Sequence, residues 1–159
     1  MQVRIVGVGK VREQYLQEGI REYLARIRPY FRVEVIDVRD EKIPPESTLG
    51  GGAAILEREG ERLLSAARGS GVIVLLDIAG EPWSSSDLAD RIRAWVMEGH
   101  STVSFLIGGP LGVSERVRTG AQHTVSLSRM TFPHQMVRLI LLEQIYRAAR
   151  IHHGDPYHK

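Results

Sequence analysis

The segment GVIVLLDI (residues 71–78) is apolar at nearly every position, not at every second one. Continuous apolar runs of this kind are typical of strands buried on both faces, and such strands belong to parallel sheets covered by helices. A second segment, TVSFLIGG (102–109), has the same character. The two segments therefore predict an α/β fold with a mostly parallel sheet flanked by helices.

Strands and helices alternate on both sides of these two runs. We expect further strands at 2–9, 33–38 and 123–128, amphipathic helices at 11–28, 53–67, 84–98 and about 133–151, and a short helix within 110–120. Residues 40–52, which include Gly50-Gly51-Gly52, form the predicted linker. AGEPW (79–83) is a predicted turn, and Thr131 is the expected N-cap of the last helix. Alternating strands and helices over 159 residues indicate a single domain spanning 1–159.

The composition excludes several kinds of chemistry. The chain has 43% hydrophobic residues and no cysteine, so disulfides, cysteine-ligated metals and a thiol nucleophile are excluded. No apolar run is long enough to cross a membrane, and the first ten residues lack the apolar core of a signal peptide. We expect a cytoplasmic protein with no membrane association and no bound metal.

Charge is distributed unevenly along the chain. Residues 1–39 carry eight basic and five acidic groups, residues 40–109 carry six and eleven, and residues 110–159 carry seven and three. Arginine outnumbers lysine by 18 to 3, and its planar guanidinium suits phosphate contacts and stacking on bases. The two basic ends are consistent with a nucleic-acid partner, and genomic base composition explains the arginine content equally well.

In open α/β sheets, ligands bind beyond the carboxyl ends of the strands. The loops to inspect therefore follow the third, fourth and fifth strands, at 79–83, 108–112 and 128–132. The glycines of 108–112 would let a ligand approach the backbone closely, or would simply form a tight turn. Asp77 could accept from a ligand, although bonding to loop amides is the commoner role and the one we favour.

The last predicted helix is apolar around most of its circumference, which indicates burial on two sides. We favour a homodimer through this C-terminal helix over a helix central to one subunit. Its polar stripe, Glu143, Arg147 and Arg150, forms either a salt-bridged surface or a cationic wall facing the loops.

The C-terminal tail (152–159) is rich in histidine. Its Tyr157, His158 and Lys159 combine a stacking ring, a titratable group and a cation, a combination that suits an unpaired RNA base. The alternative is a frayed terminus.

Four segments together resemble one family. FLIGGPLG (105–112), SLSRMTFPHQ (126–135), LEQIYRA (142–148) and PYHK (156–159) look like the ribosomal RNA large subunit methyltransferase H family, a branch of the SPOUT methyltransferases. The similarity spans essentially the whole chain. It departs from the family pattern in the Pro/Gly-rich 40–52 linker and in Lys159, where many relatives have arginine.

The resemblance implies an enzyme that uses S-adenosylmethionine to methylate N3 of a pseudouridine in 23S rRNA on the assembled ribosome. It also implies a homodimer and a C-terminal trefoil knot. By motif, the cofactor-binding residues would be Leu76, Gly108, Leu127, Ser128, Arg129, Met130, Thr131 and Phe132.

The resemblance also implies catalytic roles for Arg147, Tyr157 and His158. Arg147 would stabilise negative charge developing on the uracil carbonyls, and His158 would accept the N3 proton because its pKa lies near neutrality. The open alternatives are a SPOUT enzyme acting on tRNA and a non-catalytic, ribosome-associated nucleotide-binding module.

Overall fold

The computed structural model describes residues 1–43 and 51–154 as five strands and five helices. The strands are β1 (Gln2–Val8), β2 (Arg32–Val38), β3 (Val72–Pro82), β4 (Thr102–Ile107) and β5 (His123–Ser126). They form one sheet in the order β2-β1-β4-β3-β5, and every pair of neighbours is parallel. The predicted α/β class and parallel sheet are confirmed.

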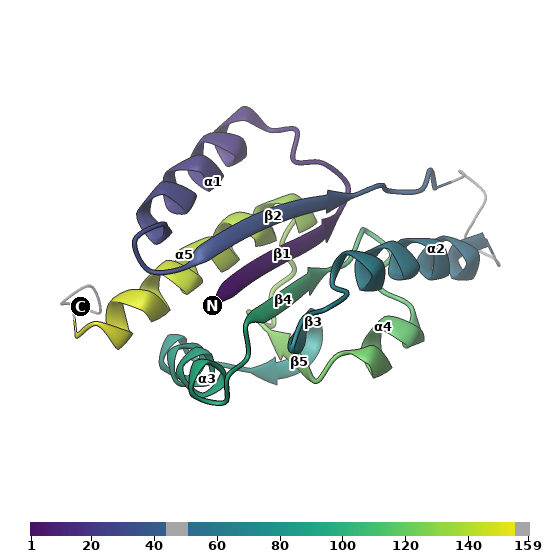
Figure 1. Ribbon diagram of the computed structural model, residues 1–159. Coiled ribbons are helices and arrows are strands. Elements are labelled where there is room, and N and C mark those ends of the chain that lie inside the picture. The colour runs from purple at the N-terminus through teal and green to yellow at the C-terminus, as the bar shows by residue number, and fades with distance from the viewer. Residues whose placement is uncertain (44–50, 155–159) are drawn as a thin grey trace.

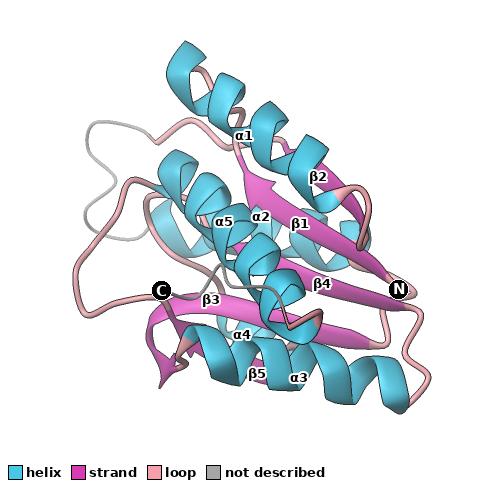
Figure 2. Ribbon diagram, turned by 90° about the vertical axis from the view of Figure 1, so that its left-hand side faces the viewer, coloured by secondary structure: helices cyan, strands magenta, loops and turns pink. Residues whose placement is uncertain are grey.

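Helices cover both faces of the sheet (Figures 1 and 2). They are α1 (Gln14–Ile27), α2 (Gly51–Ala66), α3 (Ser85–Met97), α4 (Glu115–Gly120) and α5 (His134–His152). One buried cluster joins α1, α3 and α5 to one face of the sheet, and a second joins α2 and α4 to the other. β4 lies between these clusters, and all six of its residues are buried, as its continuous apolar run predicts.

Helix α5 occupies the middle of its layer, between α1 and α3 (Figure 2). Its buried residues include Leu141, Leu142, Ile145 and Tyr146, which all belong to the cluster shared with the sheet and both neighbouring helices. Packing within one subunit therefore accounts for a large part of the apolar circumference of α5, while some of its apolar residues are only partly buried. The homodimer stays a prediction.

The predicted turn at 79–83 is wrong in part, because β3 continues to Pro82. Leu76 and Glu81 both pair with Val125, so the strand leaves the ladder after Leu76 and rejoins it at Glu81, with four residues in between. Gly80 makes this return possible, since a Cβ there would lie 2.6 Å from the backbone of Val125. The arch at 77–80 faces the carboxyl edge of the sheet.

Two helix starts also differ from the prediction. Gly51 and Gly52 were expected in the linker, but α2 begins at Gly51. The N-cap of α5 is Pro133, and Thr131 lies two residues before it. Ser84 caps α3: its side chain accepts from the Asp87 amide at 3.1 Å, while the Asp87 carboxylate accepts from the Ser84 amide at 2.8 Å.

No helix in the described ranges is both long and apolar enough to cross a membrane. Tyr157, His158 and Lys159 lie outside the described residues, as does most of the predicted linker. The trefoil knot stays a prediction.

Candidate functional site

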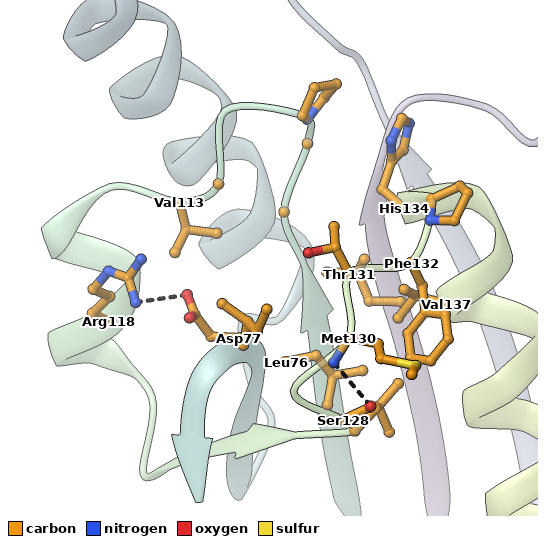
Figure 3. A pocket seen from close by; sticks show the side chains of 18 residues that line it. Leu76, Asp77, Val113, Arg118, Ser128, Met130, Thr131, Phe132, His134 and Val137 are labelled. Atoms are coloured by element: carbon orange, nitrogen blue, oxygen red, sulfur yellow. Dashed lines mark hydrogen bonds and ion pairs between the residues drawn. The ribbon is translucent and has the colours of Figure 1, made fainter.

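A cavity of about 440 Å³ opens at the carboxyl ends of β3, β4 and β5 (Figure 3). Its walls come from Leu76 and the arch within β3, the glycine loop after β4, the segment between β5 and α5, and the first turn of α5. This is the edge at which ligands bind in open α/β sheets. The volume lies within the range of small-molecule sites, about 300–1,000 Å³.

The cavity gathers seven of the eight residues expected to bind the cofactor: Leu76, Gly108, Leu127, Ser128, Met130, Thr131 and Phe132. Arg129 is exposed and does not line the cavity. Their individual binding roles stay predictions. Residues from three separate loops thus converge on one space, as the order of strands and helices predicts.

Asp77 forms an ion pair on one wall of this cavity. Its carboxylate lies 2.6 Å from the guanidinium of Arg118 on α4 (Figure 3). It also accepts a 2.9 Å hydrogen bond from the amide of Ala79. The favoured role for Asp77, bonding to a loop amide, is confirmed. The sequence reasoning missed Arg118, whose only signal is its place on the short helix that follows the glycine loop.

Two serine side chains form hydrogen bonds with the backbone of the segment that follows β5. Ser126 Oγ donates to the carbonyl oxygen of Ser128 at 2.9 Å, and Ser128 Oγ accepts from the amide of Met130 at 3.0 Å. Bonds of this local kind favour turns over regular structure. They hold the segment on the opposite wall from Asp77 (Figure 3).

The glycine loop is tightly folded on itself. A Cβ atom at Gly108 would lie 2.7 Å from the carbonyl oxygen of Gly112, and Gly112 has a φ of +90°. Side chains are excluded at the first position by contact and disfavoured at the second by backbone conformation. The loop therefore presents bare backbone to the cavity.

Arg138, one turn into α5, is fully buried. Its guanidinium donates to the carbonyl oxygens of Val8 and Gly9 at 3.0 and 2.6 Å, and it lies 3.3 Å from the carboxylate of Asp37. A Cβ at Gly7 would lie 2.5 Å from this guanidinium. Arg138 was not among the residues predicted from the sequence. A single arginine within the apolar stretch MVRLILL could have indicated it, because an arginine buried among apolar residues needs a partner for its charge.

His134 lines the cavity at the start of α5. Burial lowers the pKa of its imidazole and the nearby Arg138 lowers it further, while Asp40 acts in the opposite direction. The group is therefore neutral at pH 7, where it can both donate and accept a hydrogen bond.

Arg147 does not line the cavity. It lies thirteen residues beyond His134 on α5, which is about 20 Å along a helix. Its guanidinium forms a bidentate pair with Glu143 at 3.0 and 2.6 Å, and Arg150 donates to the Tyr146 hydroxyl at 2.7 Å. The salt-bridged surface expected of this stripe is present, and the cationic wall facing the loops of the same chain is not.

A parallel sheet with a glycine loop and a cavity at its carboxyl edge defines an α/β domain built to bind a small molecule. The chain belongs to the SPOUT methyltransferase family: a family model described as "Predicted SPOUT methyltransferase" matches residues 1–158. Relatives named "Ribosomal RNA large subunit methyltransferase H" are similar along their whole length. That of Heliobacterium modesticaldum is 49% identical, covering 100% of this chain and 99% of the relative. That of Symbiobacterium thermophilum is 50% identical, with 100% of both chains covered.

Two solved structures share the fold at low sequence identity. A probable methyltransferase from Bordetella pertussis matches with a TM-score of 0.60 at 12% identity, over 92% of this chain and 95% of that one. A probable methylase family protein from Haemophilus influenzae matches with a TM-score of 0.57 at 9% identity, over 99% and 70%. These likenesses support the SPOUT-type architecture.

Proposed function

We propose that this methyltransferase transfers a methyl group from S-adenosylmethionine to large-subunit ribosomal RNA. The observation that carries the proposal is the cavity lined by three strand-end loops in a chain of the SPOUT family. Relatives that match it from end to end carry the name of an rRNA large subunit methyltransferase.

The residues present fit the proposed cofactor. Leu76, Leu127 and Phe132 supply apolar surface for a flat base, and bare backbone at Gly108 offers hydrogen-bonding groups at close range. When bound, the cofactor supplies an activated methyl group on a positively charged sulfur. The protein's task is to hold that methyl in line with its acceptor, and positioning of this kind accounts for much of a rate enhancement.

We propose that the methyl acceptor is N3 of a pseudouridine in 23S rRNA on the assembled ribosome. The enzyme would then act in the cytoplasm. Methylation at N3 requires loss of the N3 proton. We assign proton acceptance to His158, stacking on the base to Tyr157, and stabilisation of the anion to Arg147. These roles rest on the family resemblance.

The distance between Arg147 and the cavity supports the proposed homodimer. Within one chain, Arg147 lies ten residues along α5 beyond Val137, which lines the cavity, or about 15 Å, and its guanidinium is paired with Glu143. A two-fold partner could bring its Arg147 to this cavity, because a symmetric interface places each chain's site next to the other chain's residues.

Transfer of a tritiated methyl group tests the proposal directly. Ribosomes from cells lacking this enzyme should accept the label from S-adenosylmethionine, and naked tRNA should not. Labelling of tRNA alone would favour a SPOUT enzyme of another substrate class. A protein that binds no S-adenosylmethionine in calorimetry would instead be a non-catalytic nucleotide-binding module.

A further inference from the structure

We propose that four exposed cations beside the cavity, Lys10, Arg12, Arg39 and Lys42, form a rim that contacts the phosphate backbone of the substrate RNA. This inference rests on the proposed function, because it names the surface that would present an RNA to the cavity. The four residues lie on the β1–α1 and β2–α2 loops and are all exposed. None of them lines the cavity itself.

The two loops leave the sheet side by side at its carboxyl edge (Figure 1). β1 and β2 pair in parallel as far as Val8 and Val38, and the amide of Gly9 then donates to the carbonyl oxygen of Val38 at 2.8 Å. Lys10 and Arg39 are the next residues along each chain segment. Neighbouring strands are about 4.8 Å apart, so Lys10 and Arg39 begin from adjacent points on this edge, and Arg12 and Lys42 follow two and three residues further along their loops.

This surface is joined to the cavity by α5. The amide of Arg12 donates to Gln135 Oε1 at 2.8 Å, and Gln135 is adjacent to His134, which lines the cavity. Arg138, one turn further along α5, holds the carbonyl oxygens of Val8 and Gly9. An RNA strand lying on the rim would therefore have its bases at the same edge as the cavity.

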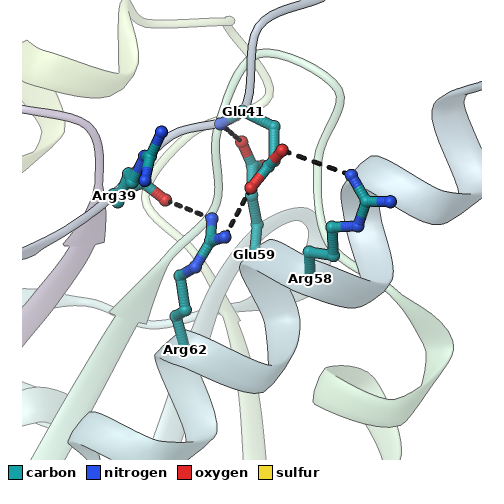
Figure 4. Close-up of polar contacts among 5 residues, drawn as sticks. All are labelled: Arg39, Glu41, Arg58, Glu59 and Arg62. Atoms are coloured by element: carbon teal, nitrogen blue, oxygen red, sulfur yellow. Dashed lines mark hydrogen bonds and ion pairs between the residues drawn. The ribbon is translucent and has the colours of Figure 1, made fainter.

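Two acidic side chains at this edge form ion pairs with arginines that do not belong to the rim. Glu41 lies 2.5 Å from Arg62 and 3.5 Å from Arg58, both on α2 (Figure 4). These two guanidinium groups hold the pKa of Glu41 below its usual range. Asp37 is paired in the same way with the buried Arg138.

The rim cations themselves are left uncompensated. None of the four forms an ion pair with a carboxylate in residues 1–43 or 51–154. Among the described residues of the same loops, 9–13 and 39–43, the exposed carboxylates are those of Glu13 and Asp40, so four cations face two anions there. The excess is positive, and a polyanion is the partner that such an excess attracts.

The backbone beneath the rim is held in place. Arg62 donates to the carbonyl oxygen of Arg39 at 2.9 Å, and the amide of Glu41 donates to the buried Glu59 at 2.9 Å (Figure 4). α2 thus fixes the position at which Arg39 leaves the sheet. Phosphate contacts set the register of a protein on its nucleic acid, and a fixed backbone is what such positioning needs.

The test compares two triple variants with equal loss of charge. The rim variant is Lys10→Ala/Arg12→Ala/Arg39→Ala. The control is Arg21→Ala/Arg28→Ala/Arg32→Ala, which removes three exposed cations from α1 and from the amino end of β2. The reaction is methyl transfer to ribosomes from cells lacking this enzyme, measured as kcat/KM over a series of salt concentrations.

We expect the rim variant to lose on the order of tenfold in kcat/KM, and the magnitude of its log–log salt slope to fall by about two to three, because each lost phosphate contact removes roughly 0.7–0.9 from that slope. The control variant should keep the wild-type rate and slope. Both variants should bind S-adenosylmethionine as the wild type does.

Two results would overturn the proposal. Equal behaviour of the two triple variants would show that the rim has no special role, and a lower rate with an unchanged salt slope would show that its contacts are not with phosphates. Failure of the proposed function is distinguishable from both, because the wild-type protein would then label no ribosomes at any salt concentration.

Discussion

The guanidinium of Arg138 donates a 2.6 Å hydrogen bond to the carbonyl oxygen of Gly9. This contact joins the last helix to the end of the first strand, directly beneath the cavity. A second contact, from Arg138 to the carbonyl oxygen of His134 at 3.2 Å, ties the same guanidinium to the first turn of its own helix. Arg138 is therefore a positioning residue: it touches no cavity surface, but it holds the turn that does.

Replacing Arg138 with Met should destabilise the fold by about 3 kcal/mol or more, because Asp37 and the two carbonyl oxygens of the first loop lose a buried partner. Urea unfolding measures the change. Affinity for S-adenosylmethionine should fall as well, at a temperature where the variant remains folded. Ile27→Ala, which removes core volume at the far end of α1, is the control for loss of stability alone and should leave cofactor affinity unchanged.

Gly7→Ala gives an independent check on this role. Its added methyl group must displace the Arg138 guanidinium, so it should weaken cofactor affinity without altering any charge. A Gly7→Ala protein with wild-type affinity would contradict the positioning role.

Gly108→Ala should reduce affinity for S-adenosylmethionine by about tenfold or more, which corresponds to about 1.4 kcal/mol. The added methyl group would meet the carbonyl oxygen of Gly112 at 2.7 Å and force the loop to shift. Calorimetric titration provides the measurement. The matched control is Gly52→Ala, where the nearest atom is 4.0 Å away and a helical alanine should be mildly stabilising.

Ser84→Ala should destabilise the protein by about 1 kcal/mol, the usual effect of losing an N-cap side chain. Ser86→Ala, two residues further on and exposed, should change stability little. Thermal or urea unfolding of both variants decides the matter. Equal effects of the two substitutions would mean that the cap contributes nothing.

The Ser84–Asp87 capping interaction also predicts that the stability of the fold depends on pH in the acid range. Hydrogen bonds from Ser84 hold the pKa of Asp87 below its ordinary value of 3.8. The unfolded chain thus binds a proton at higher pH than the folded one, so stability from this carboxylate is present above 3.8 and is lost as pH falls through the lower, folded value. In Ser84→Ala this part of the acid dependence should weaken.

His134 predicts a second pH effect, through the cofactor. Burial lowers its pKa below 6.5, so the folded protein gains its proton at lower pH than the unfolded chain. Stability should therefore decline as pH falls below 6.5 and level off below the folded pKa. Affinity for the proposed cofactor, S-adenosylmethionine, should decline over the same window, since protonated His134 would add positive charge to a cavity proposed to hold a positively charged ligand.

His134→Gln should remove the pH dependence of cofactor affinity. His123→Gln serves as the control, because burial also lowers the pKa of His123 but that side chain packs against Trp83 and Trp95 away from the cavity. Nuclear magnetic resonance titration of the imidazoles would give both pKa values. A His134 pKa at or above 6.5 would contradict the expectation.

Features that follow from a pattern along a single strand or helix could be predicted from the sequence. The apolar runs at 71–78 and 102–109 predicted buried parallel strands, and the alternation of elements predicted which loops would meet. Both follow from local periodicity together with a general rule of topology. The cavity therefore falls where it was expected, with most of its expected lining residues.

Features that depend on contacts between segments far apart in the sequence could not be predicted from it. The return of Glu81 to pair with Val125 has no local signature, because it depends on how β5 lies against β3. The pairing of Asp77 with Arg118 depends in the same way on where α4 packs. The burial of α5 between α1 and α3 resembles, in sequence, a helix that packs against another subunit.

The hydrogen bond from Arg138 to Val8 spans 130 residues of sequence, and each residue pair between β1 and β4 spans 100. β1 leaves the ribosome first during synthesis, and α5 leaves it last. Contacts between such distant segments slow folding, because the intervening chain must be ordered before they form. A nascent chain that lacks α5 also lacks one wall of the cavity, so we expect binding of the proposed methyl donor to begin only after α5 has been synthesised.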